Sequence, residues 1–168
     1  MRIHVTERQL FKQCRRRHYY EYRLHLHPKV EKKGPLWVGR AGHAGMAAYY
    51  QGQDALLGLD EWLQAKLTGE ESGEELQEID EAVALVRSIL ERYPEFAQEK
   101  DDFQVVGVEM PLEYQIPRTR VTLVGTLDLL VRKHERLWVV DHKFLQSFAD
   151  PELLELDDQM SAYLYLVW

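Results

Sequence analysis

Three charged side chains within residues 121–144 have the types and spacing needed to hold a divalent cation. Asp128 interrupts an otherwise apolar run, and burying an acid there is costly unless something compensates its charge. Asp141 and Lys143 lie two residues apart, so on a strand their side chains leave the same face. Two carboxylates can bind a hard cation such as Mg²⁺. The cation lowers the pKa of a bound water, and a nearby lysine can position that water or neutralise charge on a phosphate.

A hairpin would bring these residues together. Residues 121–131 and 137–144 are rich in β-branched and apolar side chains, and the charged segment 132–136 between them is short, which predicts two strands with a tight connection. The backbone carbonyl of His142 would then add an oxygen ligand. On spacing alone a simpler interpretation stays open, in which Asp141 and Lys143 form a surface ion pair and Asp128 is a turn residue.

Helices precede the hairpin. The spacing of apolar residues predicts four helices, over residues 6–22, 36–53, 54–68 and 74–93. Thr6 is the expected N-cap of the first helix, and Pro94 stands just beyond the expected end of the fourth. A strand follows from Phe103, then the hairpin, a linker at 145–151 and a last helix. Glu109 could be a further acid of the site, but a strand glutamate usually faces solvent. The fold class predicted is α/β (α+β), with a mixed, mostly antiparallel central sheet flanked by helices.

Composition favours a single globular domain. The chain has 168 residues, of which 45% are hydrophobic and 29% charged. We expect one domain over 1–168, made of N-terminal helices (1–102), a sheet core with the active site (103–144) and a C-terminal helix (151–168). The apolar ending Tyr163–Trp168 suggests a natural protein that continues further. No apolar run approaches a membrane span and no secretory signal is visible, so a cytoplasmic location is the default.

Charge is unevenly distributed along the chain. Residues 1–53 carry 11 Lys and Arg against 3 Asp and Glu, whereas residues 54–102 carry 4 against 15. A basic segment beside an acidic one can mark a surface that faces a polyanion, although solvated helix faces would give the same pattern. On the first helix, Arg15 and Arg16 could bind phosphates and Tyr19 and Tyr20 could stack on bases. The alternative is that these tyrosines belong to the core.

Five short motifs, taken in order, resemble those of the RecB-like branch of the PD-(D/E)XK nuclease superfamily. Each motif is weak alone, but their order and the strand–turn–strand between the third and fourth are specific, and together they span most of the chain. They are Leu10-Phe11-x-x-Cys14-Arg15-x-x-x-Tyr19-Tyr20, Gly39-x-x-x-His43, Gly125-x-x-Asp128, Asp141-x-Lys143 and Gln159-x-x-x-Tyr163. The resemblance implies a restriction-endonuclease-like core.

The resemblance also implies a role for each matching residue. His43, Asp128, Asp141 and the backbone carbonyl of His142 would hold Mg²⁺ or Mn²⁺, and Lys143 would be the catalytic lysine beside the two aspartates. Gln159 and Tyr163 would orient the lysine or contact DNA. Some relatives hold an iron–sulfur cluster through one early and three late cysteines. Cys14 is the only cysteine here, so an iron–sulfur cluster is not expected within this chain.

The function implied is metal-dependent hydrolysis of DNA phosphodiester bonds, of the RecB-like exonuclease type, in recombination, repair or defence. DNA would be the partner, with a helicase or recombination protein as a further one and no membrane. Two other hypotheses remain: a catalytically inactive module on the same fold that binds nucleic acid or serves as a scaffold, and a phosphoesterase acting on a small substrate. Retention of His43, Asp128, Asp141 and Lys143 argues against the first, and the basic N-terminal third argues against the second.

Overall fold

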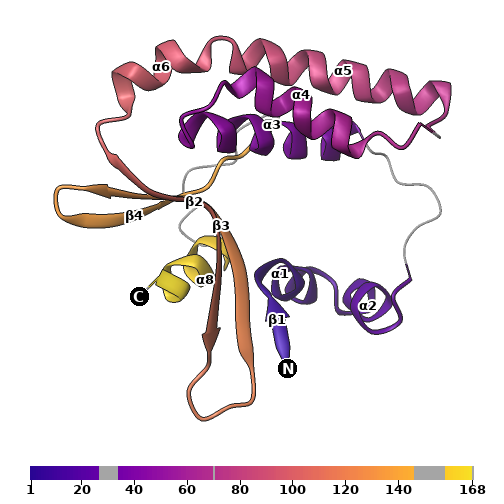
Figure 1. Ribbon diagram of the computed structural model, residues 1–168. Helices are drawn as coiled ribbons and strands as arrows, with labels where there is room; N and C mark the ends of the chain where they lie inside the picture. Colours follow the sequence, from indigo (N-terminus) through magenta and orange to yellow (C-terminus); the bar gives the residue numbers. More distant parts are fainter. Residues whose placement is uncertain (27–33, 70, 146–157, 168) are drawn as a thin grey trace.

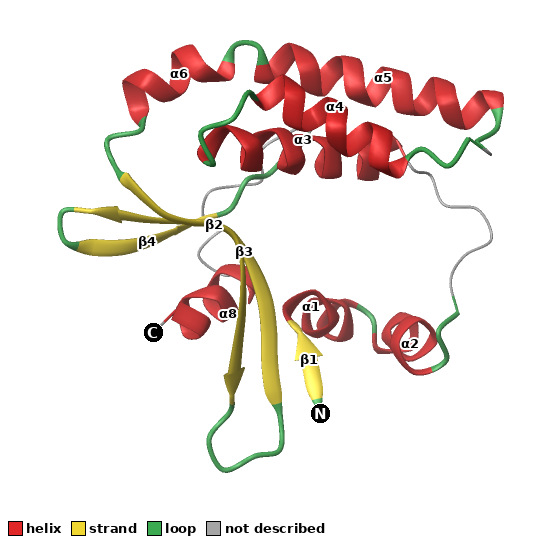
Figure 2. Ribbon diagram, viewed as in Figure 1, coloured by secondary structure: helices red, strands yellow, loops and turns green. Residues whose placement is uncertain are grey.

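The computed structural model describes residues 1–26, 34–69, 71–145 and 158–167. A layer of helices covers one end of an open, twisted sheet, and the first and last helices lie along the sheet farther from that layer (Figures 1 and 2). This arrangement places the centre of the sheet beneath the helix that carries His43.

The sheet is built around one long central strand. β3 (Thr122–Lys133) pairs along one edge with antiparallel β2 (Gln104–Gln115). Its other edge is shared by parallel β1 (Arg2–His4) near the start of β3 and antiparallel β4 (Arg136–Val140) near its end. Successive residues of β3 are buried in two runs, 123–125 and 129–131, so both faces of this central strand are covered. The predicted α/β architecture with a mixed, mostly antiparallel sheet is confirmed.

The helical layer consists of four consecutive helices, and it forms its own core. They are α3 (Gly34–Tyr50), α4 (Ala55–Lys66), α5 (Gly73–Leu90) and α6 (Tyr93–Lys100). Asp54 accepts hydrogen bonds from the first backbone N–H groups of α4, and Ser72 with Glu75 forms a capping box on α5. Their apolar faces bury Ala41, Met46, Ala55, Leu59, Ile79, Val83, Val86 and Leu90.

A second core lies between the sheet and the helices nearest the chain ends. α1 (Val5–Gln13) and α8 (Asp158–Val167) pack on the sheet and bury Val5, Leu123, Leu127, Leu130, Ala162 and Tyr163. Gly125 makes this packing possible: a Cβ there would lie 2.9–3.1 Å from Leu166, Tyr163 and Val5. The glycine of the Gly125-x-x-Asp128 motif therefore lets α8 approach the sheet closely.

The first predicted helix is broken into three pieces. α1 ends at Gln13, Cys14 is extended, and the chain resumes as α2 (Arg15–His18) and the π-helical turn η1 (Tyr19–Arg23). The break is stabilised because the Cys14 sulfur accepts a hydrogen bond from the Arg17 N–H and caps α2. The N-cap of α1 is His4 rather than the predicted Thr6. Within this first segment His18 is buried, whereas Phe11 and Cys14 are exposed.

Two other boundaries differ from prediction. Pro94 does not terminate a helix; it stands in the first turn of α6, where its missing N–H leaves no hydrogen bond unmade. β4 ends at Val140, so the prediction that Asp141 and Lys143 lie on a strand is wrong. β1 was not predicted, because three residues are too few for a periodic signal. Most of the predicted linker 145–151, residues 151–157 of the last helix and Trp168 lie outside the described residues.

The predicted hairpin between β3 and β4 is confirmed. His134 and Glu135 both have positive φ (49° and 60°), the combination of a tight turn whose twist matches its strands. Among the described residues, no helix is long and apolar enough to cross a membrane.

Candidate metal centre

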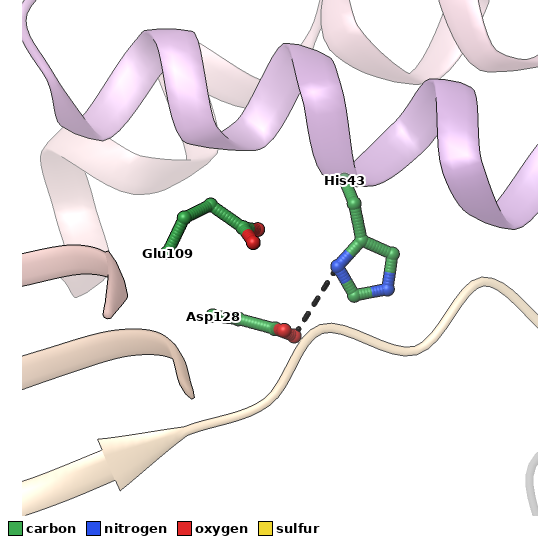
Figure 3. Close-up of side chains that lie close together, drawn as sticks. All are labelled: His43, Glu109 and Asp128. Atoms are coloured by element: carbon green, nitrogen blue, oxygen red, sulfur yellow. Dashed lines mark ion pairs between the residues drawn. The ribbon is translucent and has the colours of Figure 1, made fainter. Parts of the chain in front are cut away.

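Three side chains from three elements converge where α3 crosses the sheet. His43 comes from α3, Asp128 from β3 and Glu109 from β2, and one ligand atom of each lies within 4.8 Å of the others. His43 Nδ1 is 3.3 Å from Asp128 Oδ2. In Figure 3 the Glu109 carboxylate points toward this ion pair from the neighbouring strand. An imidazole and two carboxylates are the donor types that divalent cations take in proteins.

The sequence left Glu109 open, either as a further acid of the site or as a solvent-facing strand residue, and the structure brings its carboxylate into the cluster. The pairings Val108 with Leu129 and Met110 with Leu127 leave Glu109 opposite Asp128 on the antiparallel strand. Its φ of +47° is uncommon for a non-glycine residue and costs on the order of 1 kcal/mol. Glu109 is exposed, and one of its carboxylate oxygens lies within the cluster. The only sequence signal was its position, one strand before Asp128.

The pKa shifts in the cluster arise because several carboxyl groups lie close to the His43 imidazole. The hydrogen bond from His43 to Asp128 raises the pKa of His43 against the effect of burial, and Glu109 and Asp141 add to the rise. Burial alone would raise the pKa of Asp128, but hydrogen bonds from His43 and the His142 N–H leave it below its ordinary value. Partial burial and the neighbouring Asp128 raise the pKa of Glu109. Burial likewise raises the pKa of Asp141.

Asp141 and Lys143 lie beside this cluster on the segment that follows β4. Lys143 Nζ is 2.6 Å from Asp141 Oδ2, and the Asp141 side chain is only 6% exposed against 43% for Lys143. Between them, the backbone N–H of His142 donates to Asp128 Oδ2 at 2.8 Å. The three motif residues are thus brought together as the sequence suggested, although by an irregular segment instead of by the face of a strand.

Gln159 and Tyr163 on α8 complete a hydrogen-bond chain around the lysine. Lys143 Nζ donates to Gln159 Oε1 at 2.9 Å, and Gln159 Nε2 donates to Asp141 Oδ1 at 3.2 Å and to the Tyr163 hydroxyl at 2.8 Å. Gln9 Nε2 on α1 reaches Gln159 Oε1 at 3.4 Å. Gln159 therefore ties the first and last helices to the lysine.

Aromatic contacts hold the segment 141–145 against α3. The Phe144 ring packs on Gly42, where a Cβ would approach it to 2.3 Å, and contacts His43 with ring centroids 6.0 Å apart. The His142 ring stacks on Tyr50 at 5.6 Å, and burial lowers the pKa of this imidazole. The motif residues are therefore positioned from α3, the same helix that supplies His43.

The basic first segment presents its predicted DNA-binding side chains to solvent. Tyr19 and Tyr20 are 52% and 38% exposed, so the alternative that they belong to the core is wrong. Arg16 donates to the Tyr20 hydroxyl at 3.1 Å, and the Arg15 guanidinium lies 5.4 Å from the centroid of the Phe11 ring. Arg8 and Lys12, by contrast, pair with Asp158 at 2.6 Å.

Comparison with known proteins agrees with this geometry. Among curated proteins, none matches the chain. The family described as the PD-(D/E)XK nuclease superfamily matches residues 2–168. Members of this superfamily are usually nucleases that use divalent metals, and the His43, Glu109 and Asp128 group supplies donors suited to such a metal. The match covers nearly the whole chain, so this protein belongs to the PD-(D/E)XK nuclease superfamily.

Proposed function

We propose that this chain is a metal-dependent deoxyribonuclease of the RecB-like exonuclease type, with residues 1–168 forming one nuclease domain. One observation carries the proposal. The cluster of His43, Glu109 and Asp128 lies directly beside the ion pair between Asp141 and Lys143. Acids placed opposite each other on paired strands destabilise a sheet unless a cation offsets them. If these acids had only a structural role, their repulsion would destabilise the sheet with nothing to compensate it.

Each residue has a distinct part in this proposal. His43, Glu109, Asp128, Asp141 and the carbonyl of His142 would hold Mg²⁺ or Mn²⁺, which when bound would supply the Lewis acidity for phosphodiester hydrolysis. Asp141 and Gln159 hold the Lys143 ammonium from two sides, at 2.6 and 2.9 Å. An ammonium fixed in this way can donate to a phosphate oxygen or to the attacking water, with little reorganisation during the reaction.

Cleavage of end-labelled DNA tests the proposal. Linear and closed circular duplexes are incubated with Mn²⁺, Mg²⁺ or EDTA. We expect metal-dependent loss of the linear DNA with the circle spared. Cutting of the circle would instead indicate an endonuclease, and the same rate in EDTA as in metal would contradict the proposed chemistry.

Two substitutions test the site itself. Asp128→Asn and Lys143→Ala should each lower the cleavage rate by about 10²-fold or more, because each removes a group that acts on the reacting phosphate. Circular dichroism and thermal unfolding check that both variants fold. Parent-like cleavage by either variant would contradict the assignment. Tight DNA binding without cleavage under any metal would support the non-catalytic binding module.

A further inference from the structure

The β2–β3 hairpin extends well past the metal centre. Glu109 and Asp128 lie midway along the two strands, and the pairing continues from there to Gln115 and Thr122. Figure 1 shows this distal half projecting away from α4, α5 and α6, on the same side of the molecule as α1, α2 and β1. Apart from β1, which pairs only with the start of β3, the end of the hairpin has no strand partner among the described residues.

Hydrogen bonds fix the connection at the end of this hairpin. The Ile116 N–H donates to the Val121 carbonyl at 2.9 Å, and the Thr119 hydroxyl donates to the Ile116 carbonyl at 2.8 Å. The Thr119 hydroxyl also accepts from the Val121 N–H at 3.1 Å. Arg118 adopts a φ of +61° within this turn. The side chains of the connection are thus presented from a defined backbone.

That connection concentrates positive charge. Arg118 and Arg120 are exposed, and neither forms an ion pair with any described residue. The backbone nitrogen of Met1 donates to the Arg120 carbonyl at 2.7 Å, which holds this end of the turn against β1. The acid of the distal hairpin, Glu113, is already paired with Arg2. Exposed arginines without a carboxylate partner are well suited to bind phosphates.

The distance between the metal centre and the end of the hairpin determines how long a ligand must be to contact both. Arg120 lies eight positions before Asp128, which at ~3.3 Å per residue corresponds to roughly 26 Å. Phosphates along one strand of B-DNA are spaced by about 3.4 Å along the axis, so this distance matches about eight phosphates. The acidic layer α4–α6 would repel a polyanion on the opposite side, since residues 54–102 carry 15 acidic against 4 basic side chains.

From these observations we propose that the β2–β3 hairpin is an arm that binds the phosphate backbone of DNA about eight nucleotides from the metal centre, through Arg118 and Arg120. The DNA partner rests on the proposed function, but the arm is a separate surface. It contributes to affinity for long substrates and leaves the chemical step unchanged.

Binding of a fluorescently labelled 24-base-pair duplex, measured in EDTA over a series of salt concentrations, tests the arm. Arg118→Gln with Arg120→Gln should weaken binding about tenfold at low salt and reduce the slope of log affinity against log salt by about 2. The charge-preserving pair Arg118→Lys and Arg120→Lys should recover most of the affinity. The matched control, Lys66→Gln with Arg92→Gln, removes the same charge from the acidic layer and should bind like the parent.

A small chromogenic phosphodiester, thymidine 5′-(p-nitrophenyl phosphate), separates this inference from the proposed function. It reaches only the metal centre, so the glutamine pair should hydrolyse it at the parent's rate. Parent-like duplex binding by the glutamine pair, or an equal loss in the Lys66 and Arg92 control, would overturn the arm even if cleavage is normal. Specific loss of binding in a protein that cleaves nothing would support the arm and contradict the nuclease proposal.

Discussion

Glu109 and Asp128 face each other across two paired strands, and their repulsion depends on whether a cation lies between them. Without metal, each negative charge disfavours the other, which is consistent with the raised pKa of Glu109. In the proposed site, a bound cation would take the same two charges as its ligands. Glu109 would then lower the stability of the metal-free fold and raise the affinity for the cation.

Glu109→Gln should therefore act in opposite directions on two measurements. We expect the metal-free variant to gain a few tenths of a kcal/mol in unfolding free energy, because Glu109 is exposed and its repulsion is screened by water. The rise in Tm produced by Mg²⁺ or Mn²⁺ should become smaller. Thermal unfolding in EDTA and in metal checks both. Glu113→Gln on the same strand is the control, and an equal loss of the metal effect there would contradict the assignment.

Metal affinity should depend on pH. His43, Glu109 and Asp141 have raised pKa values, so they keep their protons to higher pH than free side chains do. A cation must displace those protons, and affinity should thus rise with pH, for His43 through a range above its ordinary pKa of about 6.5. Calorimetry at pH 6, 7 and 8, in buffers of different ionisation enthalpy, measures affinity and proton release. Binding that is independent of pH with no proton released would contradict this.

At the scale of elements, the site depends on a close contact between α3 and the segment after β4. Gly42 is in contact with the Phe144 ring, and the segment that carries Asp141 and Lys143 is held by that contact. Glycine is required at this position because any side chain would occupy the space of the ring. Neighbouring Gly39 on the same helix has no atom within 4 Å of where a Cβ would stand.

Gly42→Ala should consequently impair activity more than folding. Displacing the ring should cost about 1–3 kcal/mol of stability, and a shift of Lys143 relative to the cluster should lower cleavage by about tenfold or more. Phe144→Leu in the same chain should restore part of the rate by making room. Gly39→Ala is the control and should be neutral or stabilising by up to about 1 kcal/mol. If Gly42→Ala cleaves at the parent's rate, the contact does not position the site.

The sequence predicted the elements whose signals are local. Periodicity located α3, α4, α5 and the β3–β4 hairpin, and motif spacing singled out His43, Asp128, Asp141 and Lys143, which the structure brings together. It could not predict the role of Glu109, since that depends on register between strands and on an unusual φ. The break at Cys14 coincides with a sulfur cap on α2, which hydrophobic periodicity does not report.

At the scale of the whole molecule, the two signs of charge lie on opposite sides. α4, α5 and α6 form the acidic side, and α1, α2 and the β2–β3 hairpin form the basic one (Figure 1). Arg8 and Lys12 are engaged by Asp158, so they contribute less to an external field than their number suggests. Arg15 and Arg16 remain exposed next to Tyr19 and Tyr20.

Arg15→Ala combined with Arg16→Ala should weaken DNA binding and reduce the salt slope by about 2, because each arginine that binds a phosphate releases about one counterion. Titrations of a labelled duplex at several salt concentrations measure this. Arg8→Ala combined with Lys12→Ala should change the slope less. An unchanged slope in the first variant would remove α2 from the path of the DNA.

The two cores differ in how far apart along the chain their residues lie, and this has a consequence for the order of folding. The helical core joins residues 41–90, whereas the sheet core joins Val5 to Tyr163. Contacts between distant residues form late because closing long loops costs entropy. Pulse-labelled hydrogen exchange should show α3–α5 protected before β1 and α8, and the reverse order would contradict this. A chain still being synthesised would lack Gln159, so Lys143 and Asp141 would have no contact from α8 until that helix had docked.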